Sequence, residues 1–553
     1  MGMTVVTLLT VLPLHAQSWA KQWSQAVFTL KTFSADGSLL ASSNGFFTGQ
    51  QGEAVSAFKP FRGAHRAVII DADGKEHAVI QLMGANDLYD VAKFQVDMHK
   101  PVCPPIATKT VPTTGLVWLM PYATKQQPRC TEGTVAGSES FQSGYDYYTL
   151  NLPADEQQAG CPVFNQEGQV IGLLQPATTG STQSYAVSAR FANDLHTTGL
   201  SINDATLRST AIPIALPTDY DEALLSLYVA SSVMEGTEFE QLVDRFIQQF
   251  PQAADGYIYR ARLAAANGRY QQADDDMQKA LKVATKKDDA HYQYAQLIYQ
   301  KVVYQPQLAY EPWSLERALG ESEAAYRLQA LPVYLQQQAQ IRFAMQQYAD
   351  AYDLYMLLTK GELRGAEVFF AASQCKAQLG DRETQLALLD SAVHQFTKPY
   401  PKTAAPYLLV RAQARYEAGK YRQAVGDYNA YGELMAAQLT AEFYYQREQA
   451  ELAGHLYQQA LNDIRQAVDM APQEPLYLME QAAVEVRVGM NDEAIATARR
   501  CIAAAPDQSD GYLFLGLAQC QKGQKQEGLQ NLQKAKELGN GQAQSLIDKY
   551  SRK

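Results

Sequence analysis

The residue types that most often do chemistry are thinly spread along this chain. Its 553 residues include six cysteines and eight histidines. Neither the Cys-x-x-Cys nor the His-x-x-x-His spacing that holds zinc occurs among them, and we find no cofactor motif. The sequence therefore predicts no metal site and no cofactor, so any chemistry has to come from protein side chains alone.

The cysteines are also too few to staple a chain of this length. Cys103 and Cys130 are compatible with a disulfide in an oxidising compartment and equally with two buried thiols. Cys501 and Cys520 are expected on neighbouring helices, where they would serve as small core residues.

Strands must position any site in the first 200 residues. Short runs rich in β-branched and aromatic residues are separated by Asp-Gly, Ser-Gly and Glu-Gly turns, a pattern typical of an all-β barrel or sandwich. The runs are residues 26–33, 67–70, 78–82, 116–120, 147–151 and 170–174. We therefore expect an all-β domain over residues 26–200.

Four segments of this β region carry recognisable motifs. They are Asn44-Gly-Phe-Phe47, Gly52-Glu-Ala-Val-Ser-Ala-Phe-Lys59, Asp90-Val-Ala-Lys-Phe94 and Ala159-Gly-Cys-Pro-Val-Phe-Asn-x-x-Gly-x-Val-Ile-Gly172. In type and order they resemble bacterial trypsin-like proteases of the high-temperature-requirement type. The last is the most specific, since it is similar to that family's Gly-Asn-Ser-Gly-Gly-Pro-Leu-Phe-Asn-x-x-Gly-x-Val-Val-Gly. The resemblance covers residues 26–200 and implies a double β-barrel.

The resemblance also implies where a catalytic triad would lie, and the sequence departs from the family there. A serine protease needs a hydroxyl nucleophile, an imidazole base and a carboxylate that holds the imidazole. The nucleophile position falls on Ala159, the imidazole position on Lys59 and the carboxylate position on Asp90. Because a methyl group cannot attack a carbonyl, we expect no catalytic residue and interpret the domain as a pseudoprotease.

A thiol near the nucleophile position leaves a second hypothesis open. Cys161 lies two residues after Ala159, and cysteine replaces serine in some proteases of this fold. However, the resemblance places the nucleophile three residues before Pro162, and Cys161 directly precedes that proline. Lys59 could act as its base only with a strongly depressed pKa. The alternative is therefore a thiol peptidase that uses Cys161.

Between Glu451 and Leu538 one pattern of small and apolar residues returns at a fixed interval. Ala460, Ala494 and Gly528 lie 34 residues apart, and the positions around each are spaced three and four apart, as on one helix face. This resembles the tetratricopeptide repeat, a helix-turn-helix unit of about 34 residues. The resemblance implies a solenoid of stacked units, with a concave groove lined by the first helix of each.

The repeat resemblance further implies which side chains face the groove. They are Phe370, Gln374, Leu409, Gln413, Tyr416, Tyr445, Gln449 and Met479. Aromatic, methionine and glutamine side chains suit an extended peptide or a partner helix; the alternative is ordinary surface and packing between units. The Lys and Asn set with which some of these repeats clamp a C-terminal carboxylate is not found at these positions.

Composition and charge restrict the class of partner. The formal net charge is −11 with a pI near 5.4, and 46% of residues are hydrophobic. A folded, acidic chain without basic clusters is unsuited to nucleic acid or to an anionic membrane surface. We therefore expect protein or peptide partners and no nucleic acid.

The first residues predict export. Thr4 to Leu14 form a short apolar run, and Leu14-His15-Ala16 before Gln17 resembles a signal-peptide cleavage site. No Lys or Arg precedes the run, so an atypical signal, an upstream start and a buried first element stay open. The run is too short to span a bilayer. We expect a periplasmic or other cell-envelope or extracellular protein with no transmembrane segment in the mature chain.

These patterns predict a multidomain chain. We expect a signal peptide at 1–16, a degenerate trypsin-like β domain at 26–200, a linker at 201–219, a tetratricopeptide repeat solenoid of about nine units at 220–540, and a capping helix at 541–553. The leading functional hypothesis is a non-catalytic interaction scaffold of the cell envelope. The alternative is an exported trypsin-fold peptidase that recruits substrates through its repeats. In a third hypothesis the β domain is structural and caps the array.

Overall fold

The structure is a computed structural model in which residues 19–124, 130–140, 145–175 and 181–552 are described. The chain divides into two compact units, residues 1–285 and 286–553. The predicted signal peptide, residues 1–16, lies outside the described residues. Nowhere in the described ranges does a helix combine the length and apolar character needed to cross a membrane.

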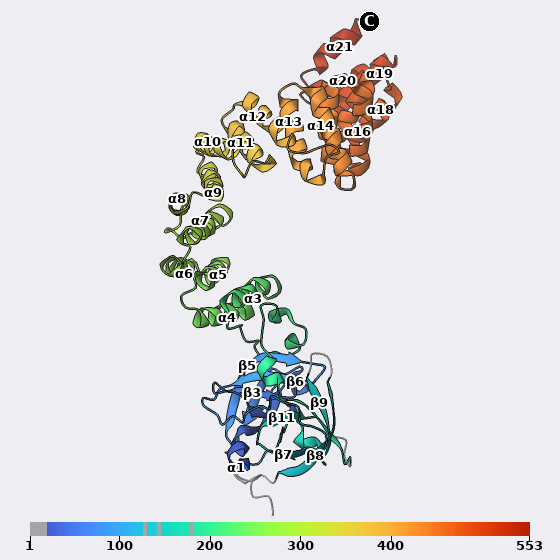
Figure 1. The fold of residues 1–553 in the computed structure, drawn as a ribbon. Coiled ribbons are helices and arrows are strands. Elements are labelled where there is room, and N and C mark those ends of the chain that lie inside the picture. The colour runs from blue at the N-terminus through green and yellow to red at the C-terminus, as the bar shows by residue number, and fades with distance from the viewer. Residues whose placement is uncertain (1–18, 125–129, 141–144, 176–180, 553) are drawn as a thin grey trace, which may run out of the picture. The chain divides into compact units, whose positions relative to one another are not determined.

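The first unit begins with a closed barrel of six antiparallel strands (Figure 1). The strands are β1 (Val27–Phe33), β2 (Leu39–Phe47), β3 (Glu53–Ser56), β4 (Arg66–Ile70), β5 (Glu76–Asn86) and β6 (Val91–Val96), and their order around the barrel is β1-β2-β3-β6-β5-β4. Alternation places one set of side chains inside: Phe94 and Val96 of β6 are buried, while Lys93 and Gln95 between them are part-exposed.

A second closed barrel of six antiparallel strands follows. Its strands are β7 (Leu116–Leu119), β8 (Thr131–Ser140), β9 (Asp146–Asn151), β10 (Pro162–Phe164), β11 (Val170–Leu174) and β12 (Ser184–Ser188), in the order β10-β11-β12-β9-β8-β7. Read from β7, this is the order of the first barrel, so the same topology occurs twice. The predicted double β-barrel is confirmed.

The segment predicted to be a linker, residues 201–219, is packed. It contains the short helices η4 (Ser201–Asn203) and η5 (Leu207–Ser209). Its residues Ile202, Leu207, Ile212, Ile214 and Leu216 are buried in one apolar cluster with side chains of the first barrel and of helices α3 (Tyr220–Val233) and α4 (Gly236–Gln249). The backbone of Leu82 in β5 also accepts from and donates to this segment, at 2.7 and 2.8 Å. The first barrel and the first helices therefore share a core.

Four helices complete the first unit. They are α3 (Tyr220–Val233), α4 (Gly236–Gln249), α5 (Ala254–Ala266) and α6 (Tyr270–Val283). Asp219 caps α3, because its carboxylate accepts the backbone N–H of Glu222 at 3.1 Å.

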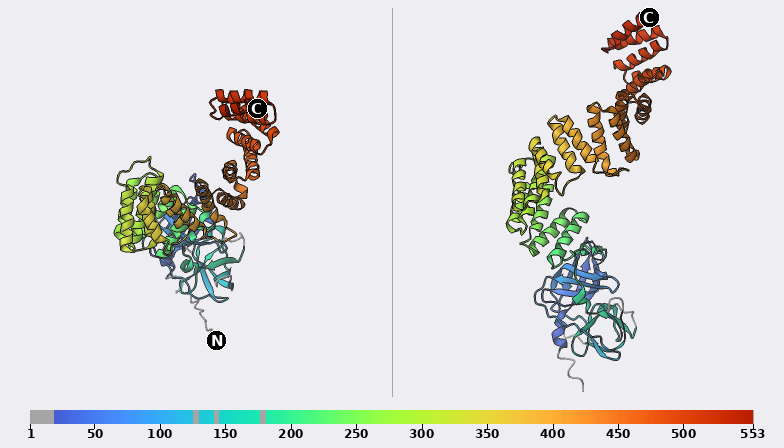
Figure 2. Two further views of the ribbon diagram at one scale, coloured as in Figure 1. Left: turned by 90° about the horizontal axis from the view of Figure 1, so that it is seen from above. Right: turned by 45° about the horizontal axis from the view of Figure 1, so that its top comes forward.

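The second unit is all-helical, and its helices follow one another as antiparallel neighbours (Figures 1 and 2). They are α7 (Lys287–Tyr304), α8 (Leu315–Leu328), α9 (Pro332–Ala344), α10 (Tyr348–Leu358), α11 (Ala366–Gln378), α12 (Arg382–Val393), α13 (Ala405–Glu417), α14 (Tyr421–Leu434), α15 (Ala441–Ala453), α16 (Tyr457–Met470), α17 (Pro475–Arg487), α18 (Asn491–Ala504), α19 (Ser509–Gln521), α20 (Lys525–Glu537) and α21 (Ala543–Ser551). This arrangement matches the predicted helical repeat array.

The turns between paired helices need one residue with a left-handed backbone. Gly489 and Gly523 supply it between α17 and α18 and between α19 and α20, with φ of 81° and 91°. In the preceding pair, His455 has φ 61° and Gly454 has φ −80°. The left-handed residue of this pair is therefore His455, 34 positions before Gly489.

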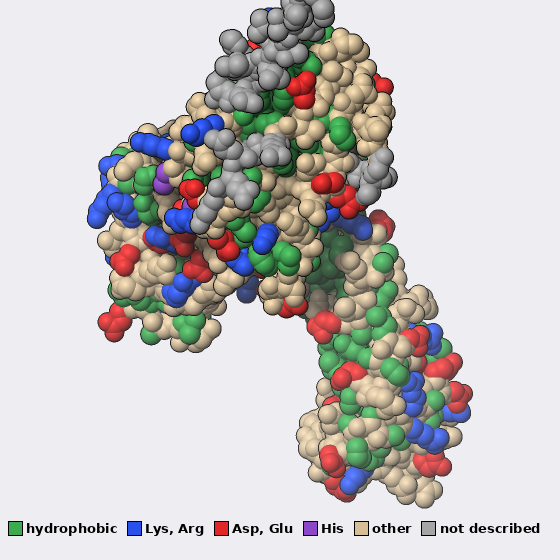
Figure 3. Space-filling view, turned by 90° about the horizontal axis from the view of Figure 1, so that it is seen from below, with side chains coloured by type: hydrophobic (Ala, Val, Ile, Leu, Met, Phe, Trp, Pro, Cys, Tyr) green, Lys and Arg blue, Asp and Glu red, His purple; other side chains and the backbone are tan. Residues whose placement is uncertain are grey.

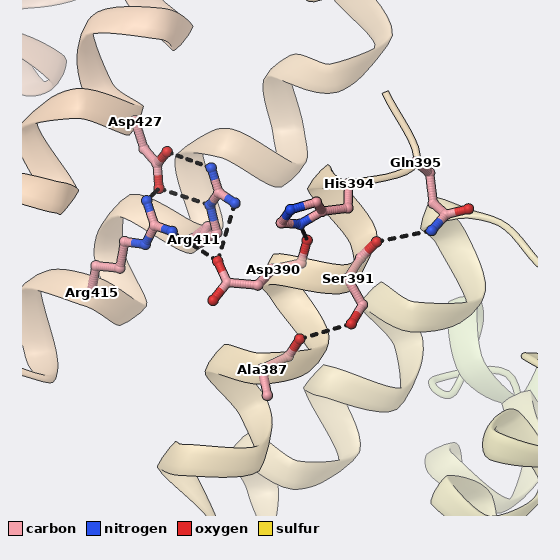
Figure 4. A network of polar contacts seen from close by, with 8 residues as sticks. All are labelled: Ala387, Asp390, Ser391, His394, Gln395, Arg411, Arg415 and Asp427. Carbon is pink, nitrogen blue, oxygen red and sulfur yellow. Dashed lines mark hydrogen bonds and ion pairs between the residues drawn. The ribbon is translucent and has the colours of Figure 1, made fainter. Parts of the chain in front are cut away.

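In three of the helix pairs, an arginine of the first helix and an aspartate of the second helix form an ion pair, which we call a clamp. Each arginine uses Nε and Nη2 to bind both carboxylate oxygens of an aspartate 16 residues later, at 2.5–2.9 Å. The pairs are Arg260–Asp276, Arg411–Asp427 and Arg447–Asp463. Figure 4 shows the second pair, to which Arg415 and Asp390 add further ionic contacts. Bidentate pairing satisfies charges that would be costly to bury alone.

Acidic and basic side chains are interspersed on the face that Figure 3 shows. This agrees with the moderate fraction of charged residues, 19%.

Candidate functional site

Two of the predicted triad positions lie side by side in the first barrel. Lys59 begins the short helix η2 (Lys59–Phe61), which follows β3, and Asp90 directly precedes β6. The Lys59 Nζ atom lies 3.4 Å from Asp90 Oδ2. The lysine side chain is 62% exposed, so this contact is solvent-screened and contributes little to stability.

Asp90 acts on the backbone rather than on an imidazole. Its Oδ1 accepts the backbone N–H groups of Phe58 and Lys59 at 3.0 and 2.7 Å. Asp90 itself is buried and has φ 56°, a conformation that aspartate tolerates better than most residues. The carboxylate therefore fixes the start of η2, and its role in this structure is to hold that turn.

Ala159 lies where the second barrel touches the first. It follows the short helix η3 (Glu156–Gln158) and precedes β10. Its carbonyl oxygen accepts from the backbone N–H and the side-chain amide of Asn44 in β2, both at 3.0 Å. Asn44 in turn accepts the Ser56 hydroxyl on its carbonyl at 2.6 Å. The Ser43 hydroxyl of β2 also donates to the Ala159 carbonyl, at 3.4 Å, so the nucleophile position is tied to the first barrel through two neighbouring residues.

Gly160 makes this close approach possible. Its φ is 81°, and a Cβ atom there would lie 2.0 Å from the carbonyl oxygen of Asn44. Any other residue would force the two barrels apart at this point. The glycine in the Ala159-Gly160-Cys161 segment therefore serves barrel contact, whatever the chemistry.

The backbone donor that a trypsin-type oxyanion hole needs is also engaged. In that arrangement the N–H of the nucleophile residue points at the developing oxyanion. Here the Ala159 N–H donates to the Glu156 carbonyl at 3.3 Å, inside the turn of η3. The chain therefore lacks the hydroxyl and imidazole at the predicted positions and holds this donor in an internal hydrogen bond.

Cys161 is part of the core of the second barrel. It is 1% exposed and belongs to an apolar cluster with Val163 and Leu174. Burial raises the pKa of its thiol to about 12. A nucleophilic cysteine needs an accessible thiolate, and these surroundings favour the neutral thiol.

The remaining cysteines also have core or part-buried positions. Cys103 and Cys130 are both free thiols, and burial raises the pKa of each. Among the residues that the structure describes, His, Cys, Asp and Glu side chains form no group of three or more that could hold a metal ion.

The predicted groove residues lie on the first helices of four successive units and are all part-exposed. Phe370 and Gln374 lie on α11; Leu409, Gln413 and Tyr416 on α13; Tyr445 and Gln449 on α15; and Met479 on α17. Successive first helices touch through aromatic rings: Phe370 meets Tyr407 at 5.4 Å, and Tyr445 meets Tyr477 at 5.5 Å between ring centroids. We call the surface that carries these eight residues the first-helix face.

Part of this face is also packing surface. Phe370, Leu409, Tyr416, Tyr445 and Met479 each pack against a buried apolar cluster. The structure therefore gives these side chains two roles, since each covers the core with one side and leaves the other accessible.

Two carboxylates on the first-helix face were missed by the sequence reasoning. Glu448 in α15 is 0% exposed, and Glu480 in α17 is part-buried. Gln449 links them: its amide donates to Glu448 Oε2 at 2.8 Å, and its hydrogen bond with Glu480 opposes the rise in the pKa of Glu480 that burial causes. Burial raises the pKa of the Tyr416 and Tyr445 phenols, and the negative charges of Glu448 and Glu480 raise it further. We call these five residues the acidic cluster.

Glu448 has an unusual electrostatic setting within the acidic cluster. Burial is the largest cause that raises its pKa to about 8, and the nearby Glu480, Glu451 and Asp463 raise it further. Its Oε1 atom is buried and has no hydrogen-bond partner among the described residues. One sequence signal could have revealed Glu448. It directly follows Arg447, whereas the corresponding arginines of the other two arginine–aspartate pairs, Arg260 and Arg411, are each followed by alanine.

Comparison with known protein families gives one match. The model of the trypsin-like peptidase domain matches residues 43–173. This range runs from β2 to β11 and includes Lys59, Asp90 and Ala159. A search of curated proteins finds no match to the chain.

Proposed function

We propose that this protein is a non-catalytic, protein-binding component of the cell envelope. In this proposal the trypsin-like domain is a pseudoprotease and the helical units are tetratricopeptide repeats whose first-helix face binds a peptide or protein segment. The observation that carries the proposal is the state of the nucleophile position: Ala159 has no hydroxyl and donates its N–H to Glu156.

The interior of the helical array supports the repeat assignment. Ala460 and Ala494, 34 residues apart, are both 0% exposed, and the small side chain lets paired helices pack closely. Left-handed turn residues recur at the same interval, at His455, Gly489 and Gly523. Stacked units of this kind expose their first helices along one surface, which is suited to an extended segment.

We also propose a structural role for the β domain, because its first barrel shares a core with α3 and α4. The end unit of a helical array exposes an apolar face that must be covered. Leu227 of α3 and Phe246 of α4 lie in one cluster with Phe94 of β6 and Ile214. In this proposal the barrel covers this end of the helices.

The competing peptidase hypothesis needs Cys161 as a thiolate, and the surroundings of that residue disfavour it. The direct test is incubation of the purified chain with unfolded casein, a fluorophosphonate probe and iodoacetamide. We expect no cleavage and no labelling of Cys161 in the folded protein. Cleavage that is lost in Cys161→Ala would establish the peptidase instead.

Location in the envelope rests on the predicted signal peptide alone. Fractionation of cells that produce the full chain, followed by N-terminal sequencing, tests it. We expect the mature protein outside the cytoplasm with Gln17 as its first residue. A chain that stays cytoplasmic with an intact start would overturn this part of the proposal and leave the binding role standing.

Binding by the first-helix face is tested with matched variants. Tyr445→Ala removes a ring from this face, whereas Tyr304→Ala removes a ring that is 71% exposed at the end of α7. After cross-linking in the envelope fraction, we expect partners captured by the native chain to be lost from Tyr445→Ala and kept by Tyr304→Ala. Equal capture by both variants would count against this face.

A further inference from the structure

Resting on the proposed function, we propose that the acidic cluster receives a cationic side chain, lysine or arginine, of the segment bound on the first-helix face. The cluster consists of Glu448, Glu480, Gln449, Tyr416 and Tyr445. It would act as an anchor that selects peptides by one positive charge.

The repeat itself shows how unusual a carboxylate is at this position. In the two other helix pairs that have an arginine–aspartate ion pair, the residues that correspond to Glu448 are Ala261 and Ala412. In the two helix pairs that follow α15 and α16, they are Ala482 and Gly516. All are buried, and a Cβ atom at Gly516 would lie 2.7 Å from the backbone of the paired helix. The position favours the smallest side chains, so packing alone does not call for a glutamate.

The carboxylate of Glu448 has unused bonding capacity. Oε2 accepts the Gln449 amide at 2.8 Å, while Oε1 is buried without a hydrogen-bond partner among the described residues. A buried acceptor that is left unpaired lowers stability. Gln449 is part-exposed on the first-helix face, and its amide is bound to Glu448 Oε2, so a group that displaces this amide would take its place at the carboxylate.

The acidic neighbours of Glu448 come from three helices. The ionic neighbours that shift its pKa are Glu480 from α17, Glu451 from α15 and Asp463 from α16. The nearest clamp arginine, Arg447, binds Asp463 at 2.5 and 2.8 Å and Asn429 at 3.0 Å. Its charge is therefore already committed, and the cluster retains an excess of negative groups.

The rest of the cluster suits an ammonium or guanidinium group. Glu480 is less deeply buried, and Arg487 lowers its pKa only as the last of four influences, while Asp510 of α19 raises it. Tyr416 and Tyr445 offer aromatic faces, which attract cations. Two carboxylates with two tyrosines are the reverse of a carboxylate clamp, so they select a positive charge.

Binding would be accompanied by release of a proton. With a pKa of about 8, Glu448 is largely protonated at neutral pH in the free protein. A bound cation favours the ionised form and lowers that pKa. A peptide with one central lysine can be titrated calorimetrically at pH 7 in phosphate and in Tris, two buffers that differ in ionisation enthalpy. The two binding enthalpies should then differ, because the released proton is taken up by the buffer.

The proposal is tested with the full chain and four pools of N-terminally acetylated octapeptides. Each pool is random except for a central Lys, Arg, norleucine or Glu. We expect the Lys or Arg pool to be retained at least tenfold better than norleucine, and the Glu pool least. A fifth pool, central norleucine with a free N-terminus, distinguishes a side-chain cation from a terminal amine.

Variants assign the preference to the cluster. Glu448→Gln and Glu480→Gln should each reduce the preference for the cationic pool to threefold or less, whereas Glu433→Gln, an exposed carboxylate of α14, should keep it. Retention of every pool to the same extent would overturn the cationic anchor and leave peptide binding intact. Retention of none would overturn both.

A stability measurement separates recognition from structure. If Glu448 served only the fold, Glu448→Ala would lower the melting temperature. We expect it to raise the melting temperature and to abolish the cationic preference, because the equivalent positions hold alanine or glycine. A lower melting temperature with an unchanged preference would refute the assignment.

Discussion

The triad positions of the β domain and the acidic cluster of the helical array use buried polar groups in opposite ways. Asp90 Oδ1 accepts two backbone N–H groups, and the Ala159 N–H and carbonyl are both hydrogen-bonded within the domain. Asp90 Oδ2 and Glu448 Oε1 are both buried without a hydrogen-bond partner among the described residues. Lys59 Nζ lies 3.4 Å from Asp90 Oδ2, whereas the ionic neighbours that shift the pKa of Glu448 are acidic. A carboxylate that binds two backbone N–H groups and lies beside a lysine fits a structural role, whereas a buried acid with an unpaired oxygen among other acidic groups indicates a role that the fold alone does not explain.

The largest effect is expected from breaking a fully satisfied buried pair. Arg411→Ala would leave Asp427 without its bidentate partner, while Arg415 still contacts it at 2.8 Å. Removing one member of a buried ion pair costs about 3–5 kcal/mol. Urea denaturation followed by helix content should show this loss of the free energy of unfolding in the second unit.

Urea denaturation of Glu448→Ala sharpens the contrast, because the change in the free energy of unfolding should have the opposite sign. Replacing an unsatisfied buried carboxylate by the residue of the equivalent positions should stabilise the unit by about 1–3 kcal/mol at pH 7.5. Destabilisation of both variants by similar amounts would show that Glu448 is as structural as Arg411.

The pH dependence of stability gives the next effect. The pKa of Glu448 rises from its ordinary value of 4.5 to about 8 in the folded chain. Between these values the folded state holds a proton that the unfolded state has released, so stability falls as pH rises, by about 1.4 kcal/mol per pH unit for one such group. Burial raises the pKa of Glu451 to about 8 as well.

Urea midpoints of the native chain measured from pH 5 to pH 8 should therefore decrease, and Glu448→Gln should flatten the decline. A native midpoint that is constant or rises over this range would contradict the acidic cluster as described.

In the β domain a smaller effect is expected. Asp90→Ala removes the acceptor of the Phe58 and Lys59 N–H groups, which costs about 1–3 kcal/mol for buried donors. Lys59→Met should change stability by less than about 0.5 kcal/mol, because the lysine is largely exposed. Hydrogen exchange of the two amides, followed by mass spectrometry, locates the change. An Lys59→Met variant that is as damaged as Asp90→Ala would mean that the ion pair, not the backbone contact, holds η2.

The sequence predicted much of the framework and three members of the acidic cluster, Tyr416, Tyr445 and Gln449, but neither of its carboxylates. Strand runs and the 34-residue interval are local periodic signals, so the two barrels and the paired helices could be foreseen from them. Glu448 looked like one more helical charge, because its burial depends on how α15, α16 and α17 close around it. The hydrogen bond from the Ala159 N–H to Glu156 was equally hidden, since it depends on the path of one turn.

The smallest expected effect comes from restoring the triad residues. Lys59→His with Ala159→Ser supplies an imidazole and a hydroxyl next to Asp90, yet we expect no measurable casein cleavage and no fluorophosphonate labelling. Asp90 Oδ1 is already occupied by two backbone N–H groups, and the Ala159 N–H is held by Glu156. A third variant, which adds Glu156→Gly to loosen η3, controls for that hydrogen bond. Labelling of the double variant alone would show that only two side chains separate this domain from a working protease, and that its polar groups are less committed to structure than their contacts indicate.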